Sequence, residues 1–144
     1  MRYGDDATIE RLLTRTTTWA VVGLSDDPQR TAYGIAAYLQ EHGKRIVPVH
    51  PSAPTVHGER GYARLADVPV PVEVVDVFVG SDRAGQVTDD AIAIGATAVW
   101  MQVGVRDEAA AARAEAAGLA VVMDTCPHIE GPRLLGWDGH VPGT

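Results

Sequence analysis

Cysteine is almost absent from this chain of 144 residues, which contains only Cys126. A single cysteine excludes a disulfide within the chain and agrees with a reducing compartment. The N-terminal residues include acids where a secretory signal has a basic end and an apolar run, so we expect a cytoplasmic protein. No apolar run approaches the roughly 18 residues that span a bilayer, so we expect no membrane partner.

Basic residues are also in the minority, because 12 lysines and arginines face 19 acidic residues and the formal net charge is −7. A protein that binds nucleic acid nonspecifically needs a basic face, so we expect no nucleic-acid partner. A small phosphorylated ligand is still compatible with this charge, since a few N–H groups and one or two cations are enough to hold it.

The chain alternates short apolar runs with segments of helical periodicity. Apolar runs that predict strands lie at residues 19–24, 45–49, 73–79, 97–101 and 119–123. Helical patterns lie at residues 5–15, 32–42, 82–94 and 107–117. Continuous apolar strands that alternate with helices are typical of a parallel sheet with helices on both faces. We therefore predict an α/β fold, a doubly wound five-stranded parallel sheet with strand order 3-2-1-4-5.

Ligands of such sheets bind at the carboxyl ends of the strands, beside the switch point. The loop after the first predicted strand has several residues suited to an anion. Gly23 allows a sharp turn and lets a ligand come close, and Gly34 allows close approach of the helix N-terminus. Ser25 and Arg30 can donate hydrogen bonds to a phosphate. Together these residues favour anion binding at the switch point.

The same loop does not favour an ordinary NAD site. The next glycine after Gly23 is Gly34, whereas the dinucleotide fingerprint needs three closely spaced glycines. That site also needs a carboxylate at the end of the second strand, and no acid lies between residues 42 and 58. NADP stays open, because His50 and the basic residues before it could meet an extra phosphate.

Four further motifs lie along the chain: G-L-S followed by P-x-R, H-P after the second strand, W-x-Q-x-G after the fourth, and M-D-x-C near the end. They belong to the stretches VVGLSDDPQRTAYGIAAYLQEHGKRIVPVHP, YARLADVPVPVEVVDVFV, AIAIGATAVWMQVGV and EAAGLAVVMDTCPHIE. From about Trp19 to Leu134, the sequence resembles the small stand-alone CoA-binding proteins. Those are similar to the N-terminal CoA-binding domain of succinyl-CoA synthetase α subunits.

The resemblance implies a Rossmann-like domain that binds coenzyme A, or an acyl-CoA, across the ends of the strands. The residues expected to bind this cofactor are Gly23, Leu24, Ser25, Arg30, Gly34, His50, Pro51, Phe78, Val79, Gly80, Gln102 and Gly104. By resemblance, the loop at residues 23–30 would hold the pyrophosphate and residues 50–51 and 78–80 would line the nucleotide. Residues 102–104 would close the other side.

The sequence departs from this family in two places. His50 stands where the family usually has asparagine, and residues 79–81 stand where it often has basic residues. Arg83 could replace the lost charge. We expect an N-terminal helix at residues 1–18, the CoA-binding Rossmann-like domain at 19–135 and a C-terminal tail at 136–144. An exposed edge strand and Trp137 would suit a homodimer.

Two residues have both a structural and a chemical interpretation. Cys126 could be a nucleophile or redox partner, aided by His128, or a small apolar residue at a strand end. Asp76 interrupts an apolar strand as either a structural acid or a base. The histidines show no metal-ligand spacing, and no set of residues converges as a catalytic centre, so we expect neither metal nor catalytic residues.

These observations leave three functional hypotheses. The first is a non-catalytic carrier, sensor or regulatory module that binds coenzyme A as a nucleotide ligand. The second is an NADP- or nucleotide-dependent enzyme. The third is a thiol redox protein in which Cys126 forms a mixed disulfide with CoA.

Overall fold

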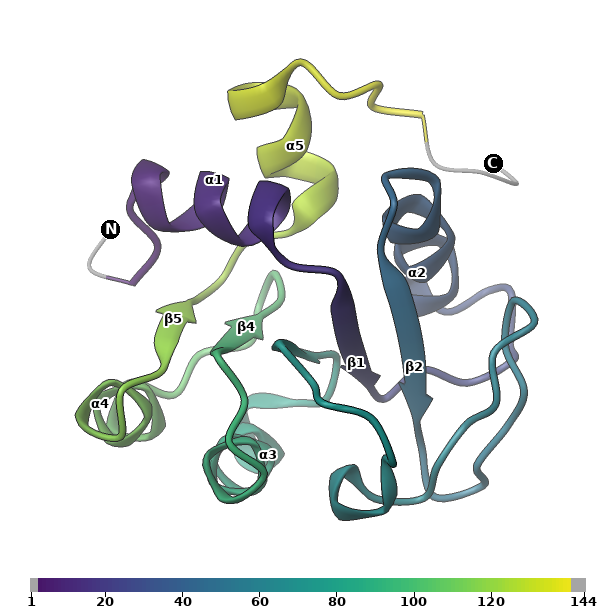
Figure 1. Ribbon diagram of the computed structural model, residues 1–144, viewed down its shortest axis with the longest axis horizontal. Helices are drawn as coiled ribbons and strands as arrows, with labels where there is room; N and C mark the ends of the chain where they lie inside the picture. The colour runs from purple at the N-terminus through teal and green to yellow at the C-terminus, as the bar shows by residue number, and fades with distance from the viewer. Residues whose placement is uncertain (1–2, 141–144) are drawn as a thin grey trace.

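A parallel sheet lies at the centre of the computed structural model, which describes residues 3–140 (Figure 1). Its strands are β1 (Thr18–Val22), β2 (Arg45–Val49), β3 (Val74–Val77), β4 (Ala98–Met101) and β5 (Ala120–Val122). Each strand overlaps the apolar run that predicts it and starts within one residue of the start of that run, and every pairing is parallel. The central strands are buried on both faces, as continuous apolar runs require. The predicted α/β fold class is therefore confirmed.

The strand order is 2-1-3-4-5 and not the predicted 3-2-1-4-5. β1 pairs with β2 on one side and with β3 on the other, so that Val22 lies opposite both Val49 and Val77. Apolar strands buried on both faces carry no pattern that selects a neighbour, and the long segment 50–73 can reach either side of β1. The switch point consequently lies between β1 and β3, and the loops that follow these two strands come together.

Helices cover both faces of the sheet (Figure 1). On one face lie α1 (Asp6–Arg15), α2 (Thr31–Glu41) and α5 (Pro127–Leu135). On the other lie α3 (Ser81–Ala93), α4 (Glu108–Ala116) and the short 3₁₀ helix η1 (Leu65–Asp67). The helical patterns predict α1 to α4, whereas α5 was not predicted. Its sequence contains Gly131 and Pro132, which disfavour a helix, but Pro127 stands at the helix start, where proline is tolerated.

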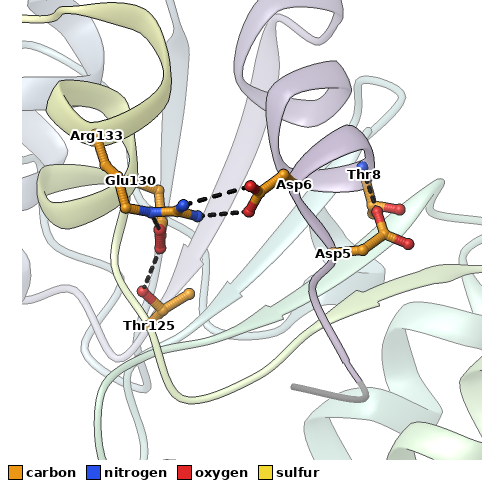
Figure 2. Close-up of polar contacts among 6 residues, drawn as sticks. All are labelled: Asp5, Asp6, Thr8, Thr125, Glu130 and Arg133. Carbon is orange, nitrogen blue, oxygen red and sulfur yellow. Dashed lines mark hydrogen bonds and ion pairs between the residues drawn. The ribbon is translucent and has the colours of Figure 1, made fainter.

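A network of polar contacts joins α1 to α5, and we call it the α1–α5 seam (Figure 2). Arg133 donates to Asp6 Oδ1 at 2.7 Å and to Glu130 Oε1 at 2.7 Å. Glu130 is buried, and its Oε2 accepts from Thr125 Oγ1 at 3.1 Å. Asp5 caps α1 by accepting from the backbone N–H of Thr8. The seam fixes α1 against the part of the chain that follows β5.

The described part of the C-terminal tail lies against α2. The Trp137 ring stacks on His42 with 4.1 Å between ring centroids, and Tyr38 Oη donates to the carbonyl of Asp138 at 2.7 Å. Residues 1–2 of the predicted N-terminal helix and residues 141–144 of the predicted tail lie outside the described residues. Among residues 3–140, no helix has the length and apolar character needed to cross a bilayer.

Candidate functional site

Two adjoining cavities open at the carboxyl edge of the sheet. The first, of about 680 Å³, lies between the loop after β1, the start of α3 and the loop after β4. The second, of about 400 Å³, lies between the ends of β1 and β2, the η1 segment and α3. Val79 and Arg83 line both cavities. The switch point between β1 and β3 therefore carries one divided cleft with two chemically different parts.

The structure brings most of the predicted site residues to this cleft. The first cavity is lined by Gly23, Arg30, Phe78, Val79, Gly80 and Gln102. The second is lined by His50, Pro51 and, again, Val79. The corrected strand order explains this grouping, because β3 beside β1 places residues 78–80 directly next to the loop after β1.

Four predicted site residues line neither cavity. Leu24 is completely buried in the core. Ser25 Oγ accepts from the backbone N–H of Asp27 within its own loop. Gly34 lies inside α2, and Gly104 lies in the loop after β4, where Asp124 and Ser81 hold it. The residue types alone could not show which side of each loop faces the cleft.

Gly23 allows the loops after β1 and β3 to approach closely. Its φ is +98°, which favours glycine, and a Cβ at this position would lie 2.7 Å from the Phe78 carbonyl oxygen. Its N–H donates to the Val49 carbonyl at 2.8 Å. Any side chain here would push apart the strand ends that form the first cavity.

The first cavity is built to attract an anion. Arg30 and Gly80 stand at the N-cap positions just before α2 and α3, and neither provides a side chain that accepts from the first backbone N–H groups of its helix. Their free N–H groups and helix dipoles favour negative charge at the cavity wall. Arg30 and Arg83 line this cavity and form no ion pair within residues 3–140. The acidic side chains of the loop after β1 do not line it.

The floor of the first cavity contains the buried residues Gln102 and Cys126, with Asp76 bonded beneath Gln102. Gln102 Nε2 donates to Asp76 Oδ1 at 2.5 Å, whereas Asp76 Oδ2 is enclosed and has no partner in the described part of the chain. Burial raises the pKa of Asp76 to about 8, although the Gln102 hydrogen bond opposes the shift. Asp76 is therefore mostly neutral at pH 7.

Cys126 lies in the cavity as a neutral thiol. Burial raises the pKa of its thiol to about 12, and the backbone N–H groups of His128 and Ile129 offset only part of this effect. The His128 ring contacts the Gly139 carbonyl at 2.5 Å, and no hydrogen bond joins it to the thiol. Because the thiolate is the nucleophile, the surroundings of Cys126 do not favour disulfide exchange.

Ser81 and Asp124 position the loop after β4, and neither was among the predicted site residues. Ser81 Oγ donates to the Gly104 carbonyl at 3.2 Å and accepts from Arg106 N–H at 2.9 Å. Asp124 accepts from Gly104 N–H at 2.7 Å and pairs with the Arg106 guanidinium at 2.8 Å. These hydrogen bonds hold the pKa of Asp124 below its usual value. The M-D-x-C motif contains Asp124 but does not reveal its role. Its hydrogen-bond partner Gly104 lies 20 residues away in the sequence, so no local pattern indicates the contact.

Within residues 3–140, no cluster of three histidine, cysteine or acidic side chains is arranged to hold a metal ion. The cleft itself offers hydrogen-bonding groups, two cations and helix N-termini.

The chain is similar to proteins that are already known. The uncharacterized protein YneT of Bacillus subtilis (strain 168) is 32% identical over 126 residues, which are 88% of this chain and 93% of that protein. A hypothetical protein from Pyrococcus horikoshii OT3 has a TM-score of 0.87 and 38% identity over 92% of this chain and 94% of its own.

A larger enzyme contains a similar domain. This is the dinucleotide-forming acetyl-coenzyme A synthetase 1 of Ca. Korarchaeum cryptofilum, solved with phosphate and ADP. The TM-score is 0.68 at 28% identity, over 78% of this chain and 26% of the enzyme. A family model described as a CoA binding domain matches residues 17–132. The resemblance seen in the sequence is confirmed, and the chain belongs to the CoA binding domain family.

Proposed function

We propose that this protein binds coenzyme A across the two cavities and acts as a carrier, sensor or regulatory module without catalysis of its own. The observation that carries the proposal is the divided cleft, whose two parts share Val79 and Arg83. One part has free cations and helix N-termini, and the other is mainly apolar. CoA needs both, because it joins phosphates to an adenine ring and a neutral arm. Membership of the CoA binding domain family supports the same ligand.

The cleft suggests how the parts of CoA are arranged. The pyrophosphate would lie near Gly23, Arg30 and Gly80, where free N–H groups and a guanidinium meet. The adenine would lie in the second cavity, against Pro51 and Leu65. The pantetheine arm would then run toward the floor of the first cavity.

We propose no catalysis because of the protonation state of the two titratable side chains at the floor of the first cavity, Asp76 and Cys126. Both titratable side chains there are buried, and their raised pKa values keep the Asp76 carboxyl largely neutral and the Cys126 thiol neutral at pH 7. An activated nucleophile needs an adjacent base or a lowered pKa, and Cys126 has neither. The floor therefore suits recognition of the arm better than covalent chemistry on it.

Calorimetric titration tests the ligand directly. Purified protein is titrated with CoA, acetyl-CoA, NAD, NADP and ATP at one fixed salt concentration. We expect CoA to bind with micromolar affinity or tighter and NAD to bind more weakly. Tight binding of NADP with no response to CoA would contradict the proposal and favour a nucleotide-dependent enzyme.

A second experiment tests the absence of thiol chemistry. The protein is incubated at pH 7 with oxidised CoA, the symmetric disulfide, and its mass is measured in the native state. We expect no adduct on the time scale of a reference thiol, because the raised pKa of Cys126 leaves almost no thiolate. Rapid addition of one CoA, abolished in Cys126→Ser, would show that the thiol is active.

A further inference from the structure

The side-chain amide of Gln102 contacts Asp76 at the floor of the first cavity. Its Nε2 donates to Asp76 Oδ1, while its Oε1 has no hydrogen-bond partner within residues 3–140. Asp76 Oδ2 is the one fully enclosed side-chain oxygen or nitrogen in that range that lacks a partner. Gln102 Oε1 also lacks a partner, so it cannot be fully enclosed, and part of its surface is accessible. Since Gln102 lines the cavity, this oxygen faces the space that a ligand would occupy.

Asp76 makes poor sense as a purely structural residue. It lies in the centre of the sheet, opposite Val21 and Trp100, where apolar side chains pack. A buried carboxyl with one unpaired oxygen is unfavourable, and replacing such a group by an apolar residue is commonly neutral or stabilising. Its hydrogen bond to Gln102 is the only one that it makes through its side chain in the described structure. Orienting Gln102 is therefore the role that the geometry leaves for it.

We propose that Asp76 is a positioning residue that turns the Gln102 amide so that Oε1 faces the cavity, and that Oε1 recognises a neutral hydrogen-bond donor on the arm of the ligand. This inference rests on the proposed function, because the arm is that of CoA. The pantetheine arm of CoA carries two kinds of neutral donor, the terminal S–H group and the amide N–H groups, and either could meet Gln102 Oε1. The apolar side chains of Val103 and Val105 and the neutral thiol of Cys126 line the same cavity as Gln102.

The recognition has a consequence for selectivity. If the donor is the terminal S–H, free CoA binds more tightly than acetyl-CoA, whose sulfur has lost its hydrogen. If the donor is an amide N–H, the two ligands bind equally and both depend on Gln102. ADP lacks the arm, so its binding is independent of Gln102 in either case.

Calorimetric titration of three variants and one control variant with CoA, acetyl-CoA and ADP tests the inference. Gln102→Met keeps the length of the side chain and removes the acceptor, and Asp76→Leu removes the group that orients it. We expect both to weaken CoA binding about tenfold, the effect of one lost hydrogen bond, and to leave ADP binding unchanged. Asp76→Asn retains an oxygen that accepts from Gln102 Nε2, so it should bind CoA as the wild type does.

Gln40→Met is the matched control, because Gln40 donates to the His57 carbonyl and lines neither cavity. Unchanged CoA affinity in Gln102→Met, with CoA binding by the wild type, would overturn this inference and leave the proposed function intact. Equal losses of CoA and ADP would overturn it too. A wild type that binds acetyl-CoA more tightly than CoA, through Gln102, would mean that the amide is reversed. Failure of the wild type to bind CoA would overturn the proposed function and this inference together.

A readout without ligand keeps the inference testable where a variant fails to fold. The side-chain amide protons of Gln102 are followed by nuclear magnetic resonance as the pH is raised. Because the pKa of Asp76 is about 8, we expect their signals to shift with a midpoint near pH 8 in the wild type and not in Asp76→Asn. Cys126 is the other titratable group beside Asp76, and its thiol stays protonated over this range. Signals that do not change with pH would overturn the coupling between the two residues.

Discussion

Glu130 and Asp76 are both buried carboxyl residues, yet their surroundings differ. In the α1–α5 seam, Glu130 Oε1 pairs with Arg133 and Oε2 accepts from Thr125 (Figure 2). At the floor of the first cavity, Asp76 has one partner, Gln102, and one oxygen without any. The seam therefore satisfies its buried carboxylate completely, whereas the cavity leaves its carboxyl half satisfied.

The helix starts differ in the same way. α1 and α4 are capped by Asp5 and Asp107, whose side chains accept backbone N–H groups. α2 and α3 start at Arg30 and Gly80 without such a cap, and both starts line the first cavity. A capping side chain would occupy the N–H groups that an anion needs.

The comparison shows where the chain gives up stability. Buried polar groups in folded proteins are nearly always paired, and exceptions concentrate at functional sites. Here the unpaired groups lie together at the carboxyl edge of the sheet, while the seam has ordinary structural pairing. Substitutions in the seam should therefore change mainly the free energy of unfolding, whereas substitutions at the first cavity should change ligand binding.

The largest expected effect comes from replacing the titratable carboxyl group of Asp76 by an amide, which cannot ionise. In the folded protein the pKa of Asp76 is about 8 against an ordinary value of 3.8. The unfolded chain therefore loses this proton first, and the free energy of unfolding falls as the pH rises from about 4 to 8. This difference of about four pKa units corresponds to on the order of 5 kcal/mol. Asp76→Asn should lack this loss.

Urea denaturation of the wild type and Asp76→Asn at pH 5, 7 and 9 measures the effect. The variant gains relative to the wild type as the pH rises, and any fixed cost of its unpaired amide leaves that trend unchanged. Asp26→Asn is the control, because Asp26 is exposed. Parallel pH profiles for the wild type and Asp76→Asn would show that Asp76 is ionised in the folded protein.

The next largest effect concerns the uncapped start of α2. Arg30→Ala should weaken CoA binding by roughly 1.5–3 kcal/mol, since it removes a charge-assisted hydrogen bond to phosphate. Arg30→Asp sharpens the comparison, because it supplies the missing cap and a repelling charge. It should raise the free energy of unfolding by about 0.5–1 kcal/mol while abolishing measurable CoA binding.

Calorimetry and urea denaturation of the same two Arg30 variants check both parts of this prediction. Arg45→Ala serves as the control, because Arg45 is exposed on β2 and lines neither cavity. Wild-type affinity in Arg30→Ala, with folding intact, would place the phosphates elsewhere in the cleft.

Much of the fold could be predicted because the relevant signals are local. The apolar runs located the strands, and Pro48, which lacks an N–H donor, lies in the edge strand β2, where proline is tolerated. The position of β3 could not be predicted, since no local pattern distinguishes its neighbours. The helix α5 was also missed, because it depends on packing such as that of Gly131 against the Trp137 ring.

The candidate site shows the same division. Gly23, Arg30 and Gln102 could be singled out from the sequence because they follow strands at the carboxyl edge. The pairing of Gln102 with Asp76, 26 residues earlier, appears only when β3 and β4 lie side by side. Asp76 was noticed as a polar residue in an apolar strand, but its partner and its unpaired oxygen are facts of the three-dimensional packing.

A smaller effect is expected from breaking the seam. Glu130→Ala leaves Thr125 Oγ1 without its partner and removes the bridge to Arg133, so the free energy of unfolding should fall by about 1–3 kcal/mol. CoA affinity should stay unchanged, because Glu130 lines neither cavity. Thermal denaturation and calorimetry measure the two quantities. Arg113→Ala, which breaks an exposed ion pair with Asp89 and lines neither cavity, is the control and should alter neither. A loss of CoA binding in Glu130→Ala would mean that the seam and the cleft are coupled.

The smallest effect is expected at the capped start of α4, where Asp107 Oδ1 accepts from Ala110 N–H at 2.9 Å. Asp107→Ala should lower the free energy of unfolding by about 1 kcal/mol, the ordinary cost of losing a helix cap. It should leave CoA affinity at the wild-type value, since Asp107 lines neither cavity. Urea denaturation should thus show that Asp107→Ala lowers the free energy of unfolding. Calorimetry should show that Arg30→Ala, at the start of α2, lowers the affinity for CoA instead. If Asp107→Ala weakened CoA binding as strongly as Arg30→Ala does, capped and uncapped helix starts would not differ in function, because binding would then depend on both.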